Sequence, residues 1–245
     1  MPATIKICGL STAPTLRAAL AARVDMVGFV FFERSPRFVT LDRARELAAE
    51  ARGRAKIVAL SVDASDKTLA AIVASVAPDL LQLHGSESPA RVAEIKRTFA
   101  VAAMKALGVA EAADFEKALE FEDAADWLLI DAKPPRDATR PGGNGAPFDW
   151  RLARSFAPKI PWLLSGGLEP ANVGEAIALS GARGVDVSSG IERAPGVKDI
   201  GKIRAFVAAA RAAFAAVPVP VIPAQAGIQE PPHERPKSGF PLSRE

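Results

Sequence analysis

The stretch TIKICGLSTA, residues 4–13, decides between the two folds that the rest of the sequence allows. Its first residues alternate isoleucines with Lys6 and Cys8, which is the two-residue period of a β-strand. A doubly wound open sheet that binds a dinucleotide carries the pattern G-x-G-x-x-G directly after its first strand. Here the strand runs into CGLSTA, which lacks that pattern. This ending favours a closed barrel over an open sheet.

The change from strand period to helix period recurs along the chain. The expected strands are residues 4–8, 26–31, 56–62, 79–84, 100–106, 127–131, 161–165 and 184–188. The expected helices lie near 12–22, 41–52, 65–76, 88–98, 111–121, 149–156, 170–180 and 198–215. Strands that alternate with helices indicate βαβ units and a parallel sheet. Eight units predict an α/β protein with a single (β/α)8 TIM barrel, one catalytic domain over residues 1–216.

Several residues are suited to begin the expected helices. Ser11, Thr40, Ser65 and Ser88 each precede a helical pattern, where a side-chain oxygen can cap the first turn. Pro170 fits the first helical position of its segment.

The composition limits the kinds of protein that the chain can be. One cysteine excludes an internal disulfide framework, and two histidines with that cysteine argue against a zinc site, so we expect no metal. The net charge is +3, from 31 basic and 28 acidic residues that are scattered, so we expect no nucleic-acid partner. No signal peptide and no long apolar run are visible, so we expect no membrane association. A single thiol is most at home in a reducing compartment, which predicts a cytoplasmic protein.

The last 29 residues, 217–245, differ in composition from the rest. They hold seven of the twenty prolines and show no helix or strand period. We interpret this segment as a disordered Pro-rich extension, with a docking peptide as the alternative.

Two inward-facing residues at strand ends are the candidate catalytic pair. In a barrel of this kind the active site lies at the carboxyl ends of the strands. Period two places Cys8 with Lys6, and Asp131 with Leu129, on the inner face of their strands. A thiol and a carboxyl group across the barrel mouth supply a general base and a general acid, and Lys6 could favour the thiolate. A buried structural cysteine and a turn aspartate are the plain alternatives.

Further polar residues follow other strands. Gln82 and His84 also face inward at the end of their strand, although His84 could simply cap a loop. Arg37, beside Pro36 in the loop ERSPRFV, could clamp a substrate carboxylate or be an ordinary surface arginine. The glycine-rich loop at 140–150 could close over a substrate or be a plain linker.

Two glycine-rich loops predict a phosphate site. The loops after the seventh and eighth expected strands form the recurrent phosphate site of such barrels, because glycines let backbone N–H groups approach the anion. Ordinary turns are the alternative. The candidate phosphate-binding residues are Gly166, Gly167, Asp186, Ser188, Ser189 and Gly190.

Taken together, these motifs resemble the phosphoribosylanthranilate isomerase family of tryptophan biosynthesis. The matching stretches are KICGL, GFVFFERSPRFV, LLQLHG, LLIDAK, PGGNGAPFDW, LSGGLEPANV and GVDVSSGIERAPGVKD. They occur in order between about residues 4 and 205, one set per barrel unit. Asn144 departs from the threonine or serine that is more usual there, which affects only loop detail.

The resemblance implies an Amadori rearrangement that needs neither metal nor cofactor. N-(5-phosphoribosyl)anthranilate would become 1-(2-carboxyphenylamino)-1-deoxyribulose 5-phosphate. Asp131 would be the general acid and Cys8 the general base, with Gly9 leaving room for substrate. Arg37 would hold the anthranilate carboxylate, Gln82 and His84 would contact substrate, and the glycine loops would hold the phosphate. The only expected partners are this small substrate and, in a homodimer, a second copy; a monomer is equally compatible.

Other functions remain open on the residues alone. Indole-glycerol-phosphate synthase would need a catalytic lysine, for which Lys6 and Lys105 are available, but its glutamate pattern is missing. A metal-dependent pentose-phosphate epimerase would need more histidines than two. A silent ligand-binding scaffold is the alternative from a different class, and the presence of both Cys8 and Asp131 speaks against it.

Overall fold

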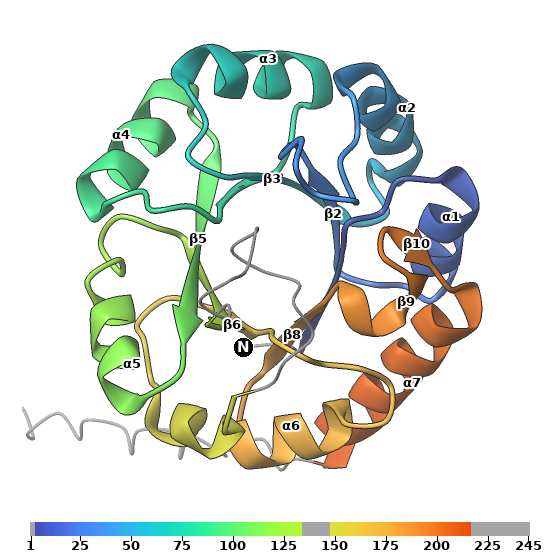
Figure 1. Ribbon diagram of the computed structural model, residues 1–245, viewed down its shortest axis with the longest axis vertical. Coiled ribbons are helices and arrows are strands. Elements are labelled where there is room, and N and C mark those ends of the chain that lie inside the picture. Colours follow the sequence, from blue (N-terminus) through green and yellow to red (C-terminus); the bar gives the residue numbers. More distant parts are fainter. Residues whose placement is uncertain (1–2, 134–147, 217–245) are drawn as a thin grey trace, which may run out of the picture.

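The computed structural model describes residues 3–133 and 148–216, which form a closed barrel of eight parallel strands. The strands follow one another in sequence order around the barrel, and β1 pairs with β8 to close it (Figure 1). They are β1 (Thr4–Cys8), β2 (Met26–Val30), β3 (Lys56–Ser61), β4 (Leu80–Leu83), β5 (Ala102–Val109), β6 (Trp127–Ala132), β7 (Trp162–Leu164) and β8 (Gly184–Val187). The TIM-barrel prediction is thereby confirmed.

Helices surround the barrel and cover its outer face (Figure 1). They are α1 (Ala13–Ala21), α2 (Leu41–Ala51), α3 (Asp66–Val76), α4 (Pro89–Phe99), α5 (Ala112–Leu119), α6 (Val173–Ser180) and α7 (Ile200–Ala216). The side chains of Thr40, Ser65 and Ser88 accept hydrogen bonds from the backbone three residues on, as expected of N-caps. Among the described residues, no helix is both long and apolar enough to cross a membrane.

Four local predictions were wrong. The fifth strand begins and ends later than 100–106, and the segment near 149–156 is a 3₁₀ helix, η1 (Trp150–Ser155). The first helix follows Thr12, not Ser11, without a side-chain cap, and Pro170 lies in the turn before α6. A 3₁₀ turn, η2 (Ser189–Ile191), and an antiparallel hairpin of β9 (Glu192–Ala194) and β10 (Val197–Lys198) were not predicted at all.

The barrel interior is filled from the amino end by an apolar layer. Its fully enclosed members come from six strands and are Met26, Val58, Leu80, Met104, Ala106, Leu129 and Leu163. Nearer the carboxyl end of β1, Cys8 packs against Val30 and Leu60. The outward-facing side chains of the strands pack on the helices in two larger clusters. The candidate polar residues at the carboxyl ends of the strands therefore lie above a packed apolar layer.

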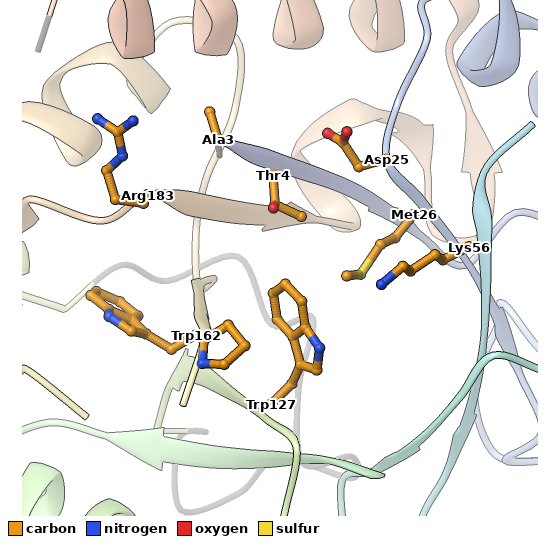
Figure 2. A pocket seen from close by; sticks show the side chains of 9 residues that line it. Ala3, Thr4, Asp25, Met26, Lys56, Trp127, Trp162 and Arg183 are labelled. Atoms are coloured by element: carbon orange, nitrogen blue, oxygen red, sulfur yellow. The ribbon is translucent and has the colours of Figure 1, made fainter. Parts of the chain in front are cut away.

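A cavity of about 310 Å³ opens at the opposite end of the barrel, among the first residues of several strands. Figure 2 shows the indole rings of Trp127 and Trp162 on one side of it and Met26 on the other. The Nζ atom of Lys56 lies 5.8 Å from the centre of the Trp127 ring. Because all these residues lie at the amino ends of their strands, this cavity is separate from the candidate active site.

Candidate active site

Cys8 is the last residue of β1 and is almost fully buried, with 4% of its surface exposed. It lies opposite Gly28 of β2, and a Cβ atom at Gly28 would lie 3.0 Å from the Cys8 sulfur. Glycine is therefore the residue that leaves space for the sulfur at this point. Gly28 was not predicted as a site residue, although a glycine inside an apolar strand indicates close approach of another group.

Lys6, two residues before Cys8, is completely buried and forms an ion pair with Asp186 at 2.8 Å. Burial raises the pKa of the Cys8 thiol; the charge of Lys6 opposes this effect and that of Asp186 adds to it. Burial also disfavours the charged form of Lys6, but the charges of Asp186 and Cys8 outweigh it, so the pKa of Lys6 lies above its ordinary value. A permanent cation thus accompanies the thiol.

Asp186 lies on the β1–β8 seam and its carboxylate accepts the Lys6 hydrogen bond. A carboxylate offers no hydrogen to a phosphate and repels it. The phosphate-binding role of Asp186 stays a prediction; in the structure its carboxylate pairs with Lys6 beside the thiol.

Asp131 lies near the end of β6, across the barrel from β1, and is 5% exposed. Its Oδ1 accepts a hydrogen bond from the Ala132 backbone at 2.9 Å, and its Oδ2 lies 3.5 Å from Nε2 of His84. Nδ1 of His84 in turn lies 3.2 Å from Nε2 of Gln82. If Gln82 donates to Nδ1, the histidine carries its proton on Nε2, facing Asp131. Gln82, His84 and Asp131, all predicted site residues, therefore lie in one continuous row of side-chain contacts.

The amide oxygen of Gln82 is buried and has no hydrogen-bond partner in the described part of the chain. A buried acceptor without a partner costs free energy, so such an atom is a natural place for a ligand hydroxyl. The next loop is held by Lys105, which donates to the Gly85 carbonyl at 2.6 Å and to Glu87 at 2.8 Å. Lys105, available as a catalytic lysine on the sequence alone, is thus engaged in fixing the loop that follows His84.

The two glycine loops lie against each other. Gly166 and Gly167 have φ values of +86° and +65°, in the left-handed region that glycine adopts without strain. Gly190 lies so close to the carbonyl of Leu168 that a Cβ atom would overlap it. The predicted phosphate residues of both loops are thereby brought together, next to the 3₁₀ turn η2.

Arg37 is buried, not exposed at the rim, and Glu192 of β9 binds it. Its Nε and Nη2 atoms donate to the two Glu192 oxygens at 2.7 and 2.9 Å. The expectation that Gly9 leaves room for substrate was wrong. Gly9 has a φ of +75°, and the Cδ atom of Arg37 lies 2.7 Å from where a Cβ would be, so Arg37 fills that space.

Glu192 and Lys198 are site residues that sequence reasoning missed. Both belong to the quoted stretch GVDVSSGIERAPGVKD, but charged residues in such a stretch look like a solvated surface. Residues 140–147 of the predicted closing loop lie outside the described residues; of the remainder, Trp150 is buried at the start of η1. Across residues 3–133 and 148–216, no three His, Cys, Asp or Glu side chains gather as a metal ion would require.

Comparisons with known proteins agree on one family. The sequence model described as N-(5'phosphoribosyl)anthranilate (PRA) isomerase matches residues 5–209. N-(5'-phosphoribosyl)anthranilate isomerase from Nitrobacter hamburgensis is 57% identical over 213 residues, which cover 87% of this chain and 95% of that protein.

Solved structures agree as well. Phosphoribosyl anthranilate isomerase from Thermotoga maritima matches with a TM-score of 0.76 and 32% identity, over 86% of this chain and 99% of that one. A structure of the enzyme in complex with reduced 1-(o-carboxyphenylamino)-1-deoxyribulose 5-phosphate matches with a TM-score of 0.71 and 30% identity, over the same shares. A third structure, of monomers generated from the dimeric T. maritima enzyme, also has a TM-score of 0.71 and 30% identity, over 86% and 99% of the two chains. This chain therefore belongs to the N-(5'-phosphoribosyl)anthranilate isomerase family.

Proposed function

We propose that Cys8 and Asp131 are the base and the acid with which this isomerase of tryptophan biosynthesis rearranges its substrate. The reaction converts N-(5-phospho-β-D-ribosyl)anthranilate into 1-(2-carboxyphenylamino)-1-deoxy-D-ribulose 5-phosphate. The observation that carries the proposal is that both groups face inward at the carboxyl ends of β1 and β6, across one barrel.

Asp131 acts first, as the acid. The protonated carboxyl group gives its proton to the ribose ring oxygen, the C1′–O bond breaks, and the anthranilate nitrogen forms a C=N bond to C1′. The 3.5 Å contact of Asp131 with His84 supports this role, because an imidazole with its proton on Nε2 would stabilise the carboxylate left after transfer.

Cys8 acts second, as the base. Its thiolate removes the proton from C2′, and the electron pair left behind forms the C1′=C2′ bond of an enolamine. A proton then returns to C1′ while the C2′ hydroxyl gives up its own proton, and the C2′=O bond of the ketone forms. Burial disfavours the thiolate form of Cys8, so the positive charge of Lys6 beside it is needed to stabilise that form. No electrons enter or leave, and every proton moves between substrate and side chain, so the reaction balances without a metal or a cofactor.

The remaining predicted site residues hold the substrate. The loops with Gly166, Gly167, Ser188, Ser189 and Gly190 bind the phosphate, and the unpartnered Gln82 oxygen accepts a sugar hydroxyl. Arg37 binds the anthranilate carboxylate with the part of its guanidinium that Glu192 leaves free. The need for a reduced thiol favours the cytoplasm as the site of action. Either a monomer or a homodimer is compatible with this chemistry, and the T. maritima relative is described as dimeric.

The test is a fluorescence assay that follows consumption of phosphoribosylanthranilate by the purified chain. We expect turnover by the wild type, and its loss in Cys8→Ala and Asp131→Asn. Both variants should still bind the reduced product analogue, because neither change touches the glycine loops. Normal turnover by either variant would show that the acid–base assignment is wrong.

A further inference from the structure

A buried chain of charges links the loop after β2 to the hairpin after β8. Glu192 accepts two hydrogen bonds from Arg37, and its Oε1 also accepts one from Nζ of Lys198 at 2.8 Å. All three side chains are at least nine-tenths buried. Arg37 and Glu192 are 155 residues apart in sequence, so the hairpin serves to bring a carboxylate to Arg37.

Lys198 continues the chain toward the base. Its Nζ donates to the carbonyl of Ser188 at 2.8 Å and lies 3.2 Å from the Ser188 hydroxyl. That hydroxyl donates to the carbonyl of Cys8 at 3.3 Å. The three hydrogens of the Lys198 ammonium group are therefore donated to Glu192 and Ser188. Ser188 in turn connects Lys198 to the backbone of Cys8.

The positive charges around Glu192 favour its ionised form. Burial alone would raise the pKa of Glu192, but Arg37 and Lys198 outweigh it, and the pKa lies below its ordinary value. Burial lowers the pKa of Lys198 to about 8, although Glu192 opposes this. The Gly196 backbone donates to the second Glu192 oxygen as well, at 3.2 Å.

Stability alone is a poor reason for such a network. Replacing a buried ion pair by apolar side chains of similar volume is often neutral or stabilising, because removing charges from water costs as much as their attraction returns. Unlike apolar side chains, hydrogen-bonded charged groups fix the orientation of each donor and acceptor. Here the fixed groups are the predicted carboxylate clamp, the phosphate loop and the backbone of the base.

We propose that Glu192 and Lys198 are positioning residues for the isomerisation. Glu192 fixes the guanidinium of Arg37 toward the substrate carboxylate, and Lys198 holds Ser188 against the backbone of Cys8. This inference rests on the proposed function, in which Arg37, Ser188 and Cys8 bind or react with one substrate. The link through Lys198 makes the three contacts depend on one another.

Lys198→Met tests the link, with Arg193→Met as its matched control. Each change removes one positive charge from the same hairpin, but Arg193 is exposed. Two readouts are needed, turnover and the ultraviolet absorbance of the thiolate as pH is raised. With one cysteine and no tyrosine in the chain, this titration reports Cys8 without interference, and Cys8→Ala gives the baseline.

We expect Lys198→Met to lower kcat by about 10- to 100-fold, which is the size of loss that small misplacements cause. Its Cys8 titration should move to higher pH, because a cation near the thiolate is gone. The facing charges that remain are Lys6 of β1 and Asp186 of β8, while Val30 and Leu60 present only apolar groups. Arg193→Met should match the wild type in both readouts. A folded Lys198→Met with wild-type kcat and titration would overturn the proposal.

Glu192→Gln tests the clamp separately. We expect KM for phosphoribosylanthranilate to rise about tenfold, because a neutral amide holds the Arg37 guanidinium more weakly than a carboxylate does. An unchanged KM would overturn this half of the proposal. If Lys198→Met does not fold, Lys198→Arg decides instead, since it keeps the charge but cannot place three hydrogens on the same atoms. A roughly tenfold lower kcat then supports the proposal and an unchanged kcat overturns it.

Wild-type turnover separates the two levels of inference. An inactive wild type means that the proposed function is wrong. An active wild type with unaffected Lys198 variants means that only the positioning role is wrong.

Discussion

Lys6 and Asp186 form an ion pair of 2.8 Å wholly inside the barrel, directly across the seam where β1 meets β8. The same two residues flank the sulfur of Cys8 electrostatically, with opposite effects on its pKa. The Lys6–Asp186 ion pair therefore joins the two strands that close the barrel and also sets the charges around the proposed base, Cys8.

Lys6→Met should therefore lose both stability and turnover. The change leaves the Asp186 carboxylate buried without its partner, which typically costs about 3–5 kcal/mol. Urea denaturation should show this loss, and kcat should fall because the thiolate is no longer favoured.

The double variant Lys6→Met, Asp186→Leu is the control for this prediction. We expect it to regain most of the stability, since no charge is left buried, but none of the turnover. Recovery of turnover in the double variant would mean that Lys6 does not support the base.

The stability of the fold should depend on Cys8 at alkaline pH. Burial raises the thiol pKa above its ordinary value, so the folded state keeps the proton after the unfolded state has lost it. Stability is then fully present below the ordinary thiol pKa and declines as pH rises toward the folded-state pKa. Urea midpoints of the wild type should fall across this window relative to Cys8→Ala. Parallel pH curves for the two proteins would contradict the shift.

Gly28→Ala should damage catalysis more than folding. The added Cβ would lie 3.0 Å from the Cys8 sulfur and push it from its place. We expect kcat to drop about 100-fold, as for a displaced reacting group, with a smaller change in KM. Gly174→Ala is the control, because its Cβ would meet only Ala213, at 3.9 Å, and should leave kinetics unchanged. Equal kcat values in the two variants would argue against a reacting sulfur.

Gln82→Met should separate binding from stability. The buried amide oxygen has no partner in the described residues, so replacing Gln82 with an apolar side chain of similar size loses only the contact of Nε2 with His84 and should lower the unfolding free energy by about 1 kcal/mol. If that oxygen accepts a sugar hydroxyl, kcat/KM should fall about tenfold. An unchanged kcat/KM would remove Gln82 from the substrate contacts.

The strands were predictable because their period of two is visible wherever β-branched residues alternate with other types. The fifth strand was misplaced because AVAAMKA is too rich in alanine to show that period, and the chain leaves α4 through Ala100 in a left-handed turn. The hairpin of β9 and β10 was not predicted because strands of three and two residues carry no pattern.

The site was predictable as far as single strands determine it. The inward faces of Cys8, Gln82 and Asp131 follow from position and period alone. Contacts between distant loops do not, because a sequence shows Arg37 and Glu192 only as two charges among 59. Burial turns these two into a fixed pair, and burial is a property of the assembled barrel.

The apolar layer below Cys8 also determines from where the sulfur can be attacked. Met26, Val58, Leu129 and their neighbours close the barrel on the amino side, so an oxidant or alkylating reagent has to enter by the carboxyl side. That is the route proposed for the sugar phosphate. A bound substrate would then shield the thiol from chemical damage, and an enzyme kept saturated in the cell would age more slowly than an idle one.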